Sequence, residues 1–486
     1  MNRKMLKPVA RHLLLMLGYG VLGALVAGFV AFILFLESRP DLEPWHLAEL
    51  SAEFTADTGL ASLAEYRELE ERLFEQLERE VYDRTGTAAP YELNRYRRGS
   101  PSDPARWPTN WNRTFELTQE NPRAVALLLH GLSDSPYSLR ASGEALHAAG
   151  IHVVGLRIPG HGTAPVGLVT TTWQDMAAAV ALAVADLYRR FPDQPLYLVG
   201  YSNGAALALH HVLLAIEEGG QRLPDRLVLL SPEIAVTEAA AMAIWQARLG
   251  RWLGLDKLAW NDILPEYDPF KYGSFAVAAA HLSHSLTTEV SERIGRLGQS
   301  GRLAQMPPIL AFTSLVDATV LAPELAARLF TPLPPGGHEL VVFGINRRAG
   351  MTSLLKWRPD EWLTAMGESP KLTFRLTVVS NEHEETLTVV AREYGADGEI
   401  GARPLALSWP PDVYSLSHVA LPFPENDPLY GGAPDPVSPG ISLGNITLRG
   451  ERGVLKIGDS AMLRQRWNPF FPYLEERMLR FLELPR

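Results

Sequence analysis

The chain has 486 residues, of which 47% are hydrophobic and 21% charged, so it holds enough apolar sequence for a large folded core. Its formal net charge of −10 at pH 7 argues against a nucleic-acid-binding surface. The absence of cysteine excludes disulfides, cysteine nucleophiles and thiolate metal sites, and no His, Asp and Glu pattern has convincing metal-ligand spacing.

The first predicted element is a membrane-spanning helix. Residues 13–36 carry no charge, and at about 1.5 Å per residue a helix of this length crosses a hydrocarbon core of about 30 Å. Four basic residues lie within residues 3–11, and acidic residues follow from Glu37. The positive-inside rule then keeps the amino terminus in the cytoplasm and exports the rest, in a bacterium to the periplasmic side of the inner membrane. A cleavable signal peptide is the alternative, although the apolar stretch is not followed by a small-x-small cleavage site before residues 37–40.

Residues 37–108 are predicted to form a helical stalk and a linker. Apolar residues recur at helical spacing between residues 47 and 84, among many Glu and Arg residues. This helix either stands as a stalk or packs on the domain that follows. Residues 90–108 are irregular, basic and proline-bearing, and we interpret them as a linker.

Two strand-to-loop transitions follow. Residues 124–129 form an apolar run typical of a buried strand, and residues 130–136 continue it as His-Gly-Leu-Ser-Asp-Ser-Pro. A second strand ends in the tight turn Pro-Gly-His-Gly at residues 159–162. We interpret His130 and His161 as structural residues that hold these loops by hydrogen bonds.

The sequence Gly-Tyr-Ser-Asn-Gly at residues 200–204 is the most informative motif. It lies between the apolar run 195–199 and the helix-forming residues 205–209. A serine on a sharp strand-to-helix turn needs small residues two positions before and after it, because the strand and the helix pass close by. The turn exposes the hydroxyl of Ser202 at the positive end of a helix, which favours a developing negative charge. Ser202 is therefore the predicted nucleophile.

An acyl-transfer site also needs two backbone N–H groups that hold the carbonyl oxygen as it becomes an oxyanion. We expect them from Asn203, which follows the serine, and from Leu132, in the loop after the early strand. From Leu127 to Leu209, the motifs Leu-Leu-Leu-His-Gly, Pro-Gly-His-Gly and Gly-Tyr-Ser-Asn-Gly follow in an order that resembles the α/β-hydrolase superfamily, within it the monoacylglycerol lipase and carboxylesterase branch. The resemblance implies an α/β fold with a mostly parallel central sheet flanked by helices, and no cofactor. It does not specify a substrate.

Residues 233–306 interrupt the alternation of strands and helices and are rich in Ala, Leu and Trp. They are predicted to form a helical cap that shields an ester from water. A plain helical insertion packed on the core is the alternative. We assign His281 and His284 to this cap.

The acid and the histidine are expected after the serine, in that order. Asp317 follows the short strand 308–313, where the resemblance puts the acid. A helix-capping role near Ala322 is the alternative for this aspartate. Glu233, after the strand 226–231, is the rival acid.

The histidine is displaced from the position the family implies. The strand 339–345, the next after the acid, is followed by no histidine. Residues 374–392 instead alternate apolar and polar around a polar turn, which predicts a β-hairpin within an insertion at about 346–405. His418 follows in an apolar, small-residue setting and is the predicted general base. His383 lies in a glutamate-rich turn and is predicted to be solvated.

Residues 473–482 are amphipathic and are predicted to close the hydrolase domain, which spans residues 109–486. The sequence therefore predicts a membrane-anchored serine hydrolase of carboxylic esters that forms an acyl-enzyme on Ser202, with His418 as base and Asp317 as acid. An acyltransferase or a peptidase with the same triad is one alternative. A catalytically inactive scaffold on the hydrolase fold is the other, because of the displaced histidine.

Overall fold

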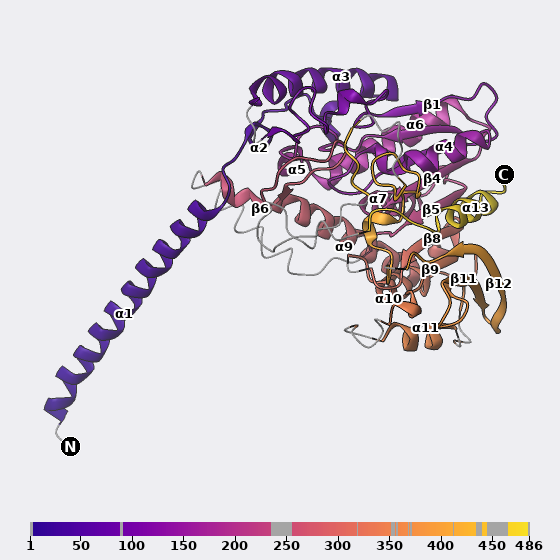
Figure 1. Cartoon of the computed structure of the whole chain (residues 1–486). Helices are drawn as coiled ribbons and strands as arrows, with labels where there is room; N and C mark the ends of the chain where they lie inside the picture. The colour runs from indigo at the N-terminus through magenta and orange to yellow at the C-terminus, as the bar shows by residue number, and fades with distance from the viewer. Residues whose placement is uncertain are drawn as a thin grey trace.

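The computed structural model describes residues 3–87, 91–234, 255–317, 319–350, 355, 358–367, 369, 372–411, 413–433, 440–444 and 465–484. A central sheet with helices on both faces forms the domain, and a long helix projects from it (Figure 1). The α-helices are α1 (Arg3–Ser38), α2 (Pro44–Leu47), α3 (Leu63–Glu80), α4 (Arg140–Ala148), α5 (Gly167–Thr170), α6 (Trp173–Arg190), α7 (Asn203–Glu218), α9 (Val277–Gln299), α10 (Ala322–Leu325), α11 (Pro359–Gly367) and α13 (Phe471–Phe481). Shorter helical turns are η1 (Ala56–Thr58), η2 (Tyr82–Arg84), η4 (Pro104–Arg106), η5 (Pro136–Leu139), η6 (Asp256–Ala259), η7 (Arg302–Gln305), η8 (Ala326–Phe330), η9 (Arg347–Ala349) and η11 (His418–Ala420).

The main sheet has ten strands in the order β1-β3-β2-β4-β5-β8-β9-β10-β11-β12. All neighbours from β3 to β10 run parallel, whereas β1 at one edge and β11 and β12 at the other are antiparallel. The strands are β1 (Phe115–Leu117), β2 (Val125–Leu129), β3 (His152–Leu156), β4 (Leu196–Tyr201), β5 (Arg226–Leu230), β8 (Ile309–Ser314), β9 (Glu339–Phe343), β10 (Arg375–Asn381), β11 (Thr388–Gly395) and β12 (Gly398–Ser408), and β6 (Trp260–Asp262) and β7 (Phe275–Ala276) form a separate pair.

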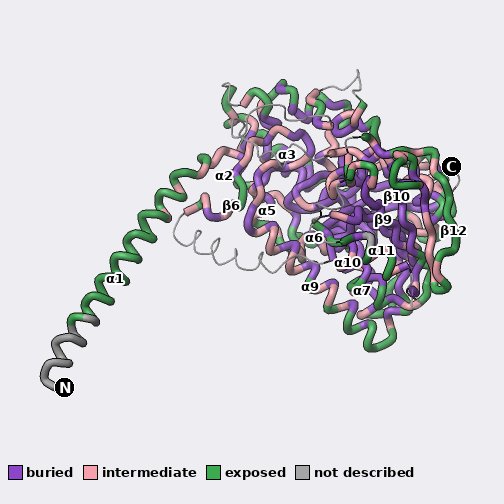
Figure 2. Tube along the Cα trace, turned by 60° about the horizontal axis from the view of Figure 1, so that its bottom comes forward, coloured by how far each residue is buried: buried purple, intermediate pink, exposed green. Residues whose placement is uncertain are grey.

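Each face of the sheet buries its own hydrophobic cluster, because successive side chains of a strand point to opposite faces. In β2, Leu127 lies in one cluster with α6, α7 and α9, and Leu128 lies in the other with α4 and α13. Both leucines are fully buried, which explains why the parallel strands are continuous apolar runs. Figure 2 shows this buried centre in contrast to the exposed α1.

The predicted hairpin is present as β10 and β11, which pair antiparallel from Leu376 opposite Tyr394 to Asn381 opposite Val389. It extends the main sheet, since β10 also pairs with β9. The third strand of the insertion, β12, was not predicted. Its sequence carries glycine and a proline, and most of its residues are exposed, so the alternation typical of a half-buried strand is missing.

The segment before the sheet packs on the domain. Tyr66 and Leu73 of α3 are buried, and the Tyr66 hydroxyl donates a hydrogen bond of 2.7 Å to the carbonyl oxygen of Arg157. In the stretch that we interpreted as a linker, Tyr96 is buried and donates to the carbonyl oxygen of Thr163 at 2.8 Å. Of the two sequence interpretations of α3, the structure thus favours a helix packed on the domain over a stalk.

A buried ion cluster joins this segment to the turn at residues 159–162. Arg157 Nε lies 2.7 Å from Glu70 Oε1, and Arg157 Nη2 lies 2.9 Å from Glu53 Oε1. Glu53 also accepts a hydrogen bond of 2.9 Å from the Gly160 N–H. The arginine thus places its one positive charge between two carboxylates that the fold largely removes from water.

Replacing Arg157 with methionine is expected to cost about 3–5 kcal/mol of stability, because two buried carboxylates lose their counter-charge. The measurement is a thermal melt of the full chain in detergent. The matched control is Arg98→Met, which breaks exposed pairs with Glu78 and Asp83 and is expected to cost less than about 1 kcal/mol. Equal melting temperatures for the two variants would contradict the role given to the cluster.

Helix α1 contains a stretch, Leu14–Ser38, that is long and apolar enough to cross a membrane, with a mean hydropathy of 2.4. None of its most apolar window is buried against the rest of the chain. A signal sequence near the amino terminus would meet the same criteria of length and composition, so these two properties alone do not distinguish it from a membrane span.

Candidate active site

The predicted nucleophile lies on a strained turn between β4 and α7. Ser202 has φ 54° and ψ −117°, a positive φ that non-glycine residues rarely adopt and that is often found at functional sites. The neighbouring glycines are required by space. A Cβ at Gly204 would lie 2.0 Å from the carbonyl oxygen of Leu129, and one at Gly200 would lie 2.5 Å from Cα of Ala205.

The three residues predicted as nucleophile, base and acid lie in one hydrogen-bonded chain. His418 Nε2 is 3.0 Å from Ser202 Oγ, and His418 Nδ1 is 2.8 Å from Asp317 Oδ2. Ser202 and Asp317 follow the carboxyl ends of the parallel strands β4 and β8. His418 is the first residue of η11, which comes after the inserted strands. A nucleophile in contact with a base that a third group orients is the geometry of an activated serine.

The chain returns from the inserted strands to a fixed place beside β8 and β9. Ser314 Oγ donates to the carbonyl oxygen of Leu416 at 2.9 Å, and Asn346 Nδ2 donates to that of Val413 at 2.9 Å. The hydroxyl of Tyr201, next to the serine, lies 3.4 Å from the carbonyl oxygen of His418. These bonds hold His418 at the site although the three strands β10, β11 and β12 are inserted between it and β9.

The environment of Asp317 keeps it ionised. Burial acts to raise its pKa, but the charge and hydrogen bond of His418 oppose burial, and so do the backbone N–H groups of Val320 and Thr319. The net result is a pKa of Asp317 below its ordinary value. Its Oδ1 accepts from the Thr319 N–H at 2.8 Å and from the Val320 N–H at 3.0 Å, which leaves Oδ2 for the histidine. The carboxylate is thus oriented as well as charged.

One predicted oxyanion residue, Asn203, directly follows Ser202, and the loop that carries the other, Leu132, passes close to the serine. Asn203 is the first residue of α7, so its N–H is among those at the helix start that have no intrahelical partner. Leu132 lies in the loop after β2, which runs over the serine, because a Cβ at Gly131 would lie 3.4 Å from Ser202 Cβ. Among the described residues, no group of three or more His, Asp and Glu could hold a metal ion.

Comparison with known proteins places this chain in a family. Residues 120–333 match the family model described as "Serine aminopeptidase, S33". The chain is also similar to a thermostable monoacylglycerol lipase of Bacillus sp., with 35% identity over 229 residues, which are 47% of this chain and 78% of that protein. The chain belongs to the monoacylglycerol lipase and esterase branch of the α/β-hydrolase superfamily. The family model reaches residue 333, so it includes Ser202 and Asp317 but not His418.

Solved structures of this α/β-hydrolase branch are more distant. The monoacylglycerol lipase of Paleococcus ferrophilus has 17% identity and a TM-score of 0.36, over 48% of this chain and 88% of that chain. A thermostable carboxyl esterase of Bacillus coagulans has 15% identity and a TM-score of 0.37, over 48% and 84%. The family assignment rests on the relative from Bacillus sp. rather than on these structures.

The other histidines of the hydrolase lie outside the hydrogen-bonded chain. His130 Nε2 accepts from the Ile158 N–H at 3.0 Å, so Nδ1 donates to the carbonyl oxygen of Gly131 at 2.9 Å. Burial lowers its pKa well below the usual range, so the ring is neutral and holds the loop, the role that we predicted. His383 is exposed in its turn, and His281 belongs to α9.

Within the described part of the chain, the carboxylate oxygens of Glu233, the rival acid, bond to other partners and make no hydrogen bond or ion pair with His418. Ser283 of α9 donates to Oε1 at 2.6 Å, and Asn203 Nδ2 lies 3.4 Å from Oε2. Burial raises the pKa of Glu233, although the Ser283 hydroxyl and the charge of His418 oppose this effect. The carboxyl group therefore connects α9 to the turn that carries the nucleophile.

The residues that sequence reasoning missed at the hydrolase site are those that support its loops. Glu70 bonds to Arg157, and Glu53 accepts from the N–H of Gly160 in the turn at residues 159–162. Both lie in the segment that we predicted as a stalk and linker, with packing on the domain as the alternative for its helix. A signal for Glu70 is present in the sequence. It lies four residues after Tyr66 and three before Leu73, on the face that α3 buries.

Proposed function

We propose that this protein is a membrane-anchored serine hydrolase that cleaves carboxylic esters. Ser202 is the nucleophile, His418 the general base and Asp317 the group that orients the imidazole. The proposal is carried by the hydrogen-bonded chain from Ser202 Oγ through His418 to Asp317, with contacts of 3.0 and 2.8 Å.

In the first half of the reaction, His418 Nε2 takes the proton of the Ser202 hydroxyl as Oγ bonds to the acyl carbon. The N–H groups of Asn203 and Leu132 hold the oxyanion, and Asp317 stabilises the imidazolium. The imidazolium then gives its proton to the departing alcohol, and an acyl-enzyme remains. Water attacks this ester with His418 again as base, which releases the acid and restores Ser202. No cofactor takes part in these steps.

The anchor is supported by the length and composition of Leu14–Ser38 and by the charge difference across it. Basic residues precede the span and acidic residues follow it, so the hydrolase domain lies on the exported side. Because the domain follows directly after the span, the enzyme meets its esters at or near the membrane surface.

An ester is favoured over other acyl substrates because the relative from Bacillus sp. is named a monoacylglycerol lipase. The description of the matching family model, a serine aminopeptidase, makes peptide hydrolysis the second candidate. Both reactions use the same nucleophile, so they differ only in the leaving group.

The test uses the full chain in detergent, a fluorophosphonate probe, p-nitrophenyl esters of short to long acyl chains and aminoacyl p-nitroanilides. We expect covalent labelling by the probe and hydrolysis of the esters, with little release from the anilides. Labelling with faster anilide hydrolysis would identify a peptidase instead. A folded protein that neither reacts with the probe nor cleaves any of these substrates would support the inactive scaffold.

A further inference from the structure

Helix α1 meets the domain without a free linker. It ends at Ser38, and the side chain of the next residue, Arg39, already reaches the domain. Arg39 Nη1 donates to the carbonyl oxygen of Lys257 at 3.0 Å, and Nη2 donates to that of Asn261 at 2.9 Å. These acceptors belong to η6 and β6, which lie beside the end of α1 (Figure 1). Pro40 follows directly and restricts the backbone at this point.

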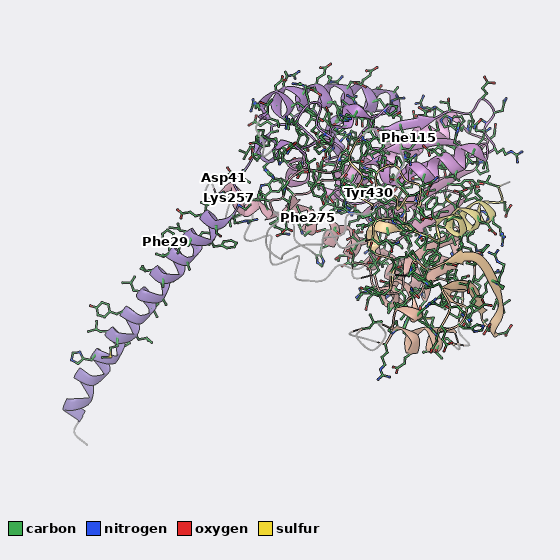
Figure 3. All side chains as sticks on the ribbon, viewed as in Figure 1. Phe29, Asp41, Phe115, Lys257, Phe275 and Tyr430 are labelled. Carbon is green, nitrogen blue, oxygen red and sulfur yellow. The ribbon has the colours of Figure 1, made fainter. Side chains whose placement is uncertain are left out.

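The contact is reciprocal. Lys257 Nζ donates to the carbonyl oxygen of Arg39 at 3.0 Å and lies 2.9 Å from Asp41 Oδ1. Figure 3 shows Lys257 and Asp41 together where α1 joins the domain. The side chain of Asp41 is 94% exposed, so the ion pair alone adds little stability. The backbone acceptors on both sides matter more, because each of the two long side chains fixes the main chain of the other. We call Arg39, Asp41 and Lys257 the clamp.

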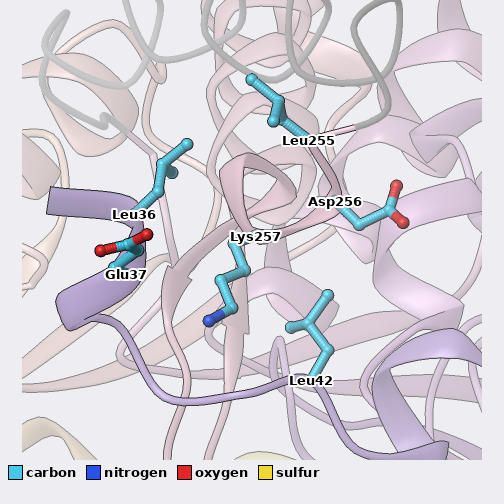
Figure 4. A pocket seen from close by; sticks show the side chains of 6 residues that line it. All are labelled: Leu36, Glu37, Leu42, Leu255, Asp256 and Lys257. Carbon is cyan, nitrogen blue, oxygen red and sulfur yellow. The ribbon is translucent and has the colours of Figure 1, made fainter. Parts of the chain in front are cut away.

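A pocket of about 380 Å³ lies beside the clamp. Three leucines and three charged residues line it (Figure 4). The lining residues are Leu36, Glu37, Leu42, Leu255, Asp256 and Lys257. Leu36 and Glu37 belong to the last turn of the apolar stretch Leu14–Ser38. A helix that spans a hydrocarbon core of about 30 Å places its last turn at the depth of the lipid headgroups. The pocket therefore lies at the boundary between lipid and water.

We propose that this pocket binds a zwitterionic phospholipid of the bilayer that α1 crosses, and that the clamp holds the η6–β6 side of the domain against the membrane surface. Leucines at this depth match the upper acyl chains. The lining has two carboxylates, Glu37 and Asp256, whereas the ammonium group of Lys257 is already paired with Asp41. An ammonium-bearing headgroup therefore fits the charge of the lining better than an anionic one. The proposal rests on the membrane span of the proposed function and not on Ser202.

The chain has no cysteine, so a single introduced cysteine carries a fluorescent label at one known position. The full chain is reconstituted in phosphatidylethanolamine and phosphatidylcholine vesicles whose lipids bear a spin-label quencher, either on the headgroup or deep in the acyl chain. Leu255→Cys reports on the pocket and Val26→Cys on the span. The control is Ala402→Cys on β12, which is exposed and lies far from α1 in Figure 1.

We expect the acyl-chain quenchers to lower the fluorescence of the label at position 26. The headgroup quenchers are expected to quench the label at position 255 roughly fivefold more than the label at position 402, because the bilayer interface has a limited thickness. Adding Lys257→Ala is expected to lower quenching at position 255 roughly twofold, since two hydrogen bonds of the clamp are lost. Quenching at position 26 and hydrolysis of p-nitrophenyl esters in detergent are expected to stay unchanged. A matched control, Arg328→Ala, breaks an exposed pair with Glu324 and is expected to leave every signal unchanged.

Equal quenching at positions 255 and 402, with strong quenching at position 26, would overturn the proposal and leave the anchor intact. A label at position 255 that is shielded without quenching, in a protein that sediments as a dimer, would also overturn it and assign the pocket to a second copy. In a parallel set of vesicles the quencher is carried by an anionic lipid, and stronger quenching at position 255 there than in the zwitterionic vesicles would refute the lipid class. The absence of quenching at position 26 would refute the membrane span itself, while the ester assay in detergent would still test the proposed chemistry.

Discussion

Replacing Ser202 with alanine is expected to abolish labelling by a fluorophosphonate probe and to lower kcat for ester hydrolysis by about 10⁶-fold. The hydroxyl is the atom that forms the acyl-enzyme, and no other group of the hydrogen-bonded chain can replace it. Any remaining rate comes from direct attack of water on the bound ester, because substrate binding and the oxyanion N–H groups assist that reaction too. The measurement is ester hydrolysis in detergent, with the melting temperature as a check on folding.

Ser231→Ala is the matched control. This serine directly follows the neighbouring strand β5, is fully buried, and has a positive φ like the nucleophile. Within the described part of the chain its Oγ has no hydrogen-bond partner, so it lacks the contact with His418 that activates Ser202. The control is expected to keep its labelling and its rate. Wild-type hydrolysis by a folded Ser202→Ala protein would end the serine-hydrolase hypothesis.

The turn at Ser202 was predictable because its causes are local. Gly200 and Gly204 are needed for the close passage of β4 and α7, and both lie within two residues of the serine. The apolar run before it and the helix after it are equally local signals. The mostly parallel sheet was implied by the resemblance to the α/β-hydrolase superfamily, and the structure confirms it.

The position of His418 depends on long-range contacts that the sequence does not display. Its loop is held by Ser314 and Asn346, which lie far away in the sequence and come near only because β8 and β9 are neighbours. Sequence reasoning reached the histidine by its apolar setting and by elimination. The exposed strand β12 lacked the alternation that revealed β10 and β11, and so it went unrecognised.

The packing of the amino-terminal segment was the least predictable feature. The sequence left open whether α3 stands as a stalk or packs on the domain, and its Glu70 is buried beside Arg157, which directly follows β3. Periodicity alone cannot show which charge has a partner elsewhere in the fold. The sequence did show that Glu70 lies on the apolar face of α3, and this position indicates that its carboxylate is buried.

The identity of the acid can be tested by experiment, because the sequence offers two carboxyl groups for this role, Asp317 and Glu233. Asp317→Asn is expected to lower kcat by about 10⁴-fold, because an amide cannot hold the imidazole of His418 in the required tautomer or stabilise its charge. Glu233→Gln is the matched change at the rival carboxyl. Its contacts are with Ser283 and Asn203, so an amide of the same shape is expected to cost less than about tenfold.

Both variants are compared by kcat for one p-nitrophenyl ester and by the rate of fluorophosphonate labelling. Labelling requires the activated serine, so it should slow strongly in Asp317→Asn and little in Glu233→Gln. The reverse order would assign the acid to Glu233. Similar large losses in both variants would mean that the two carboxyl groups act together on His418, which the hydrogen bond from Nδ1 to Asp317 alone does not predict. The expected order follows from that bond, because only the group that touches the ring can fix its tautomer.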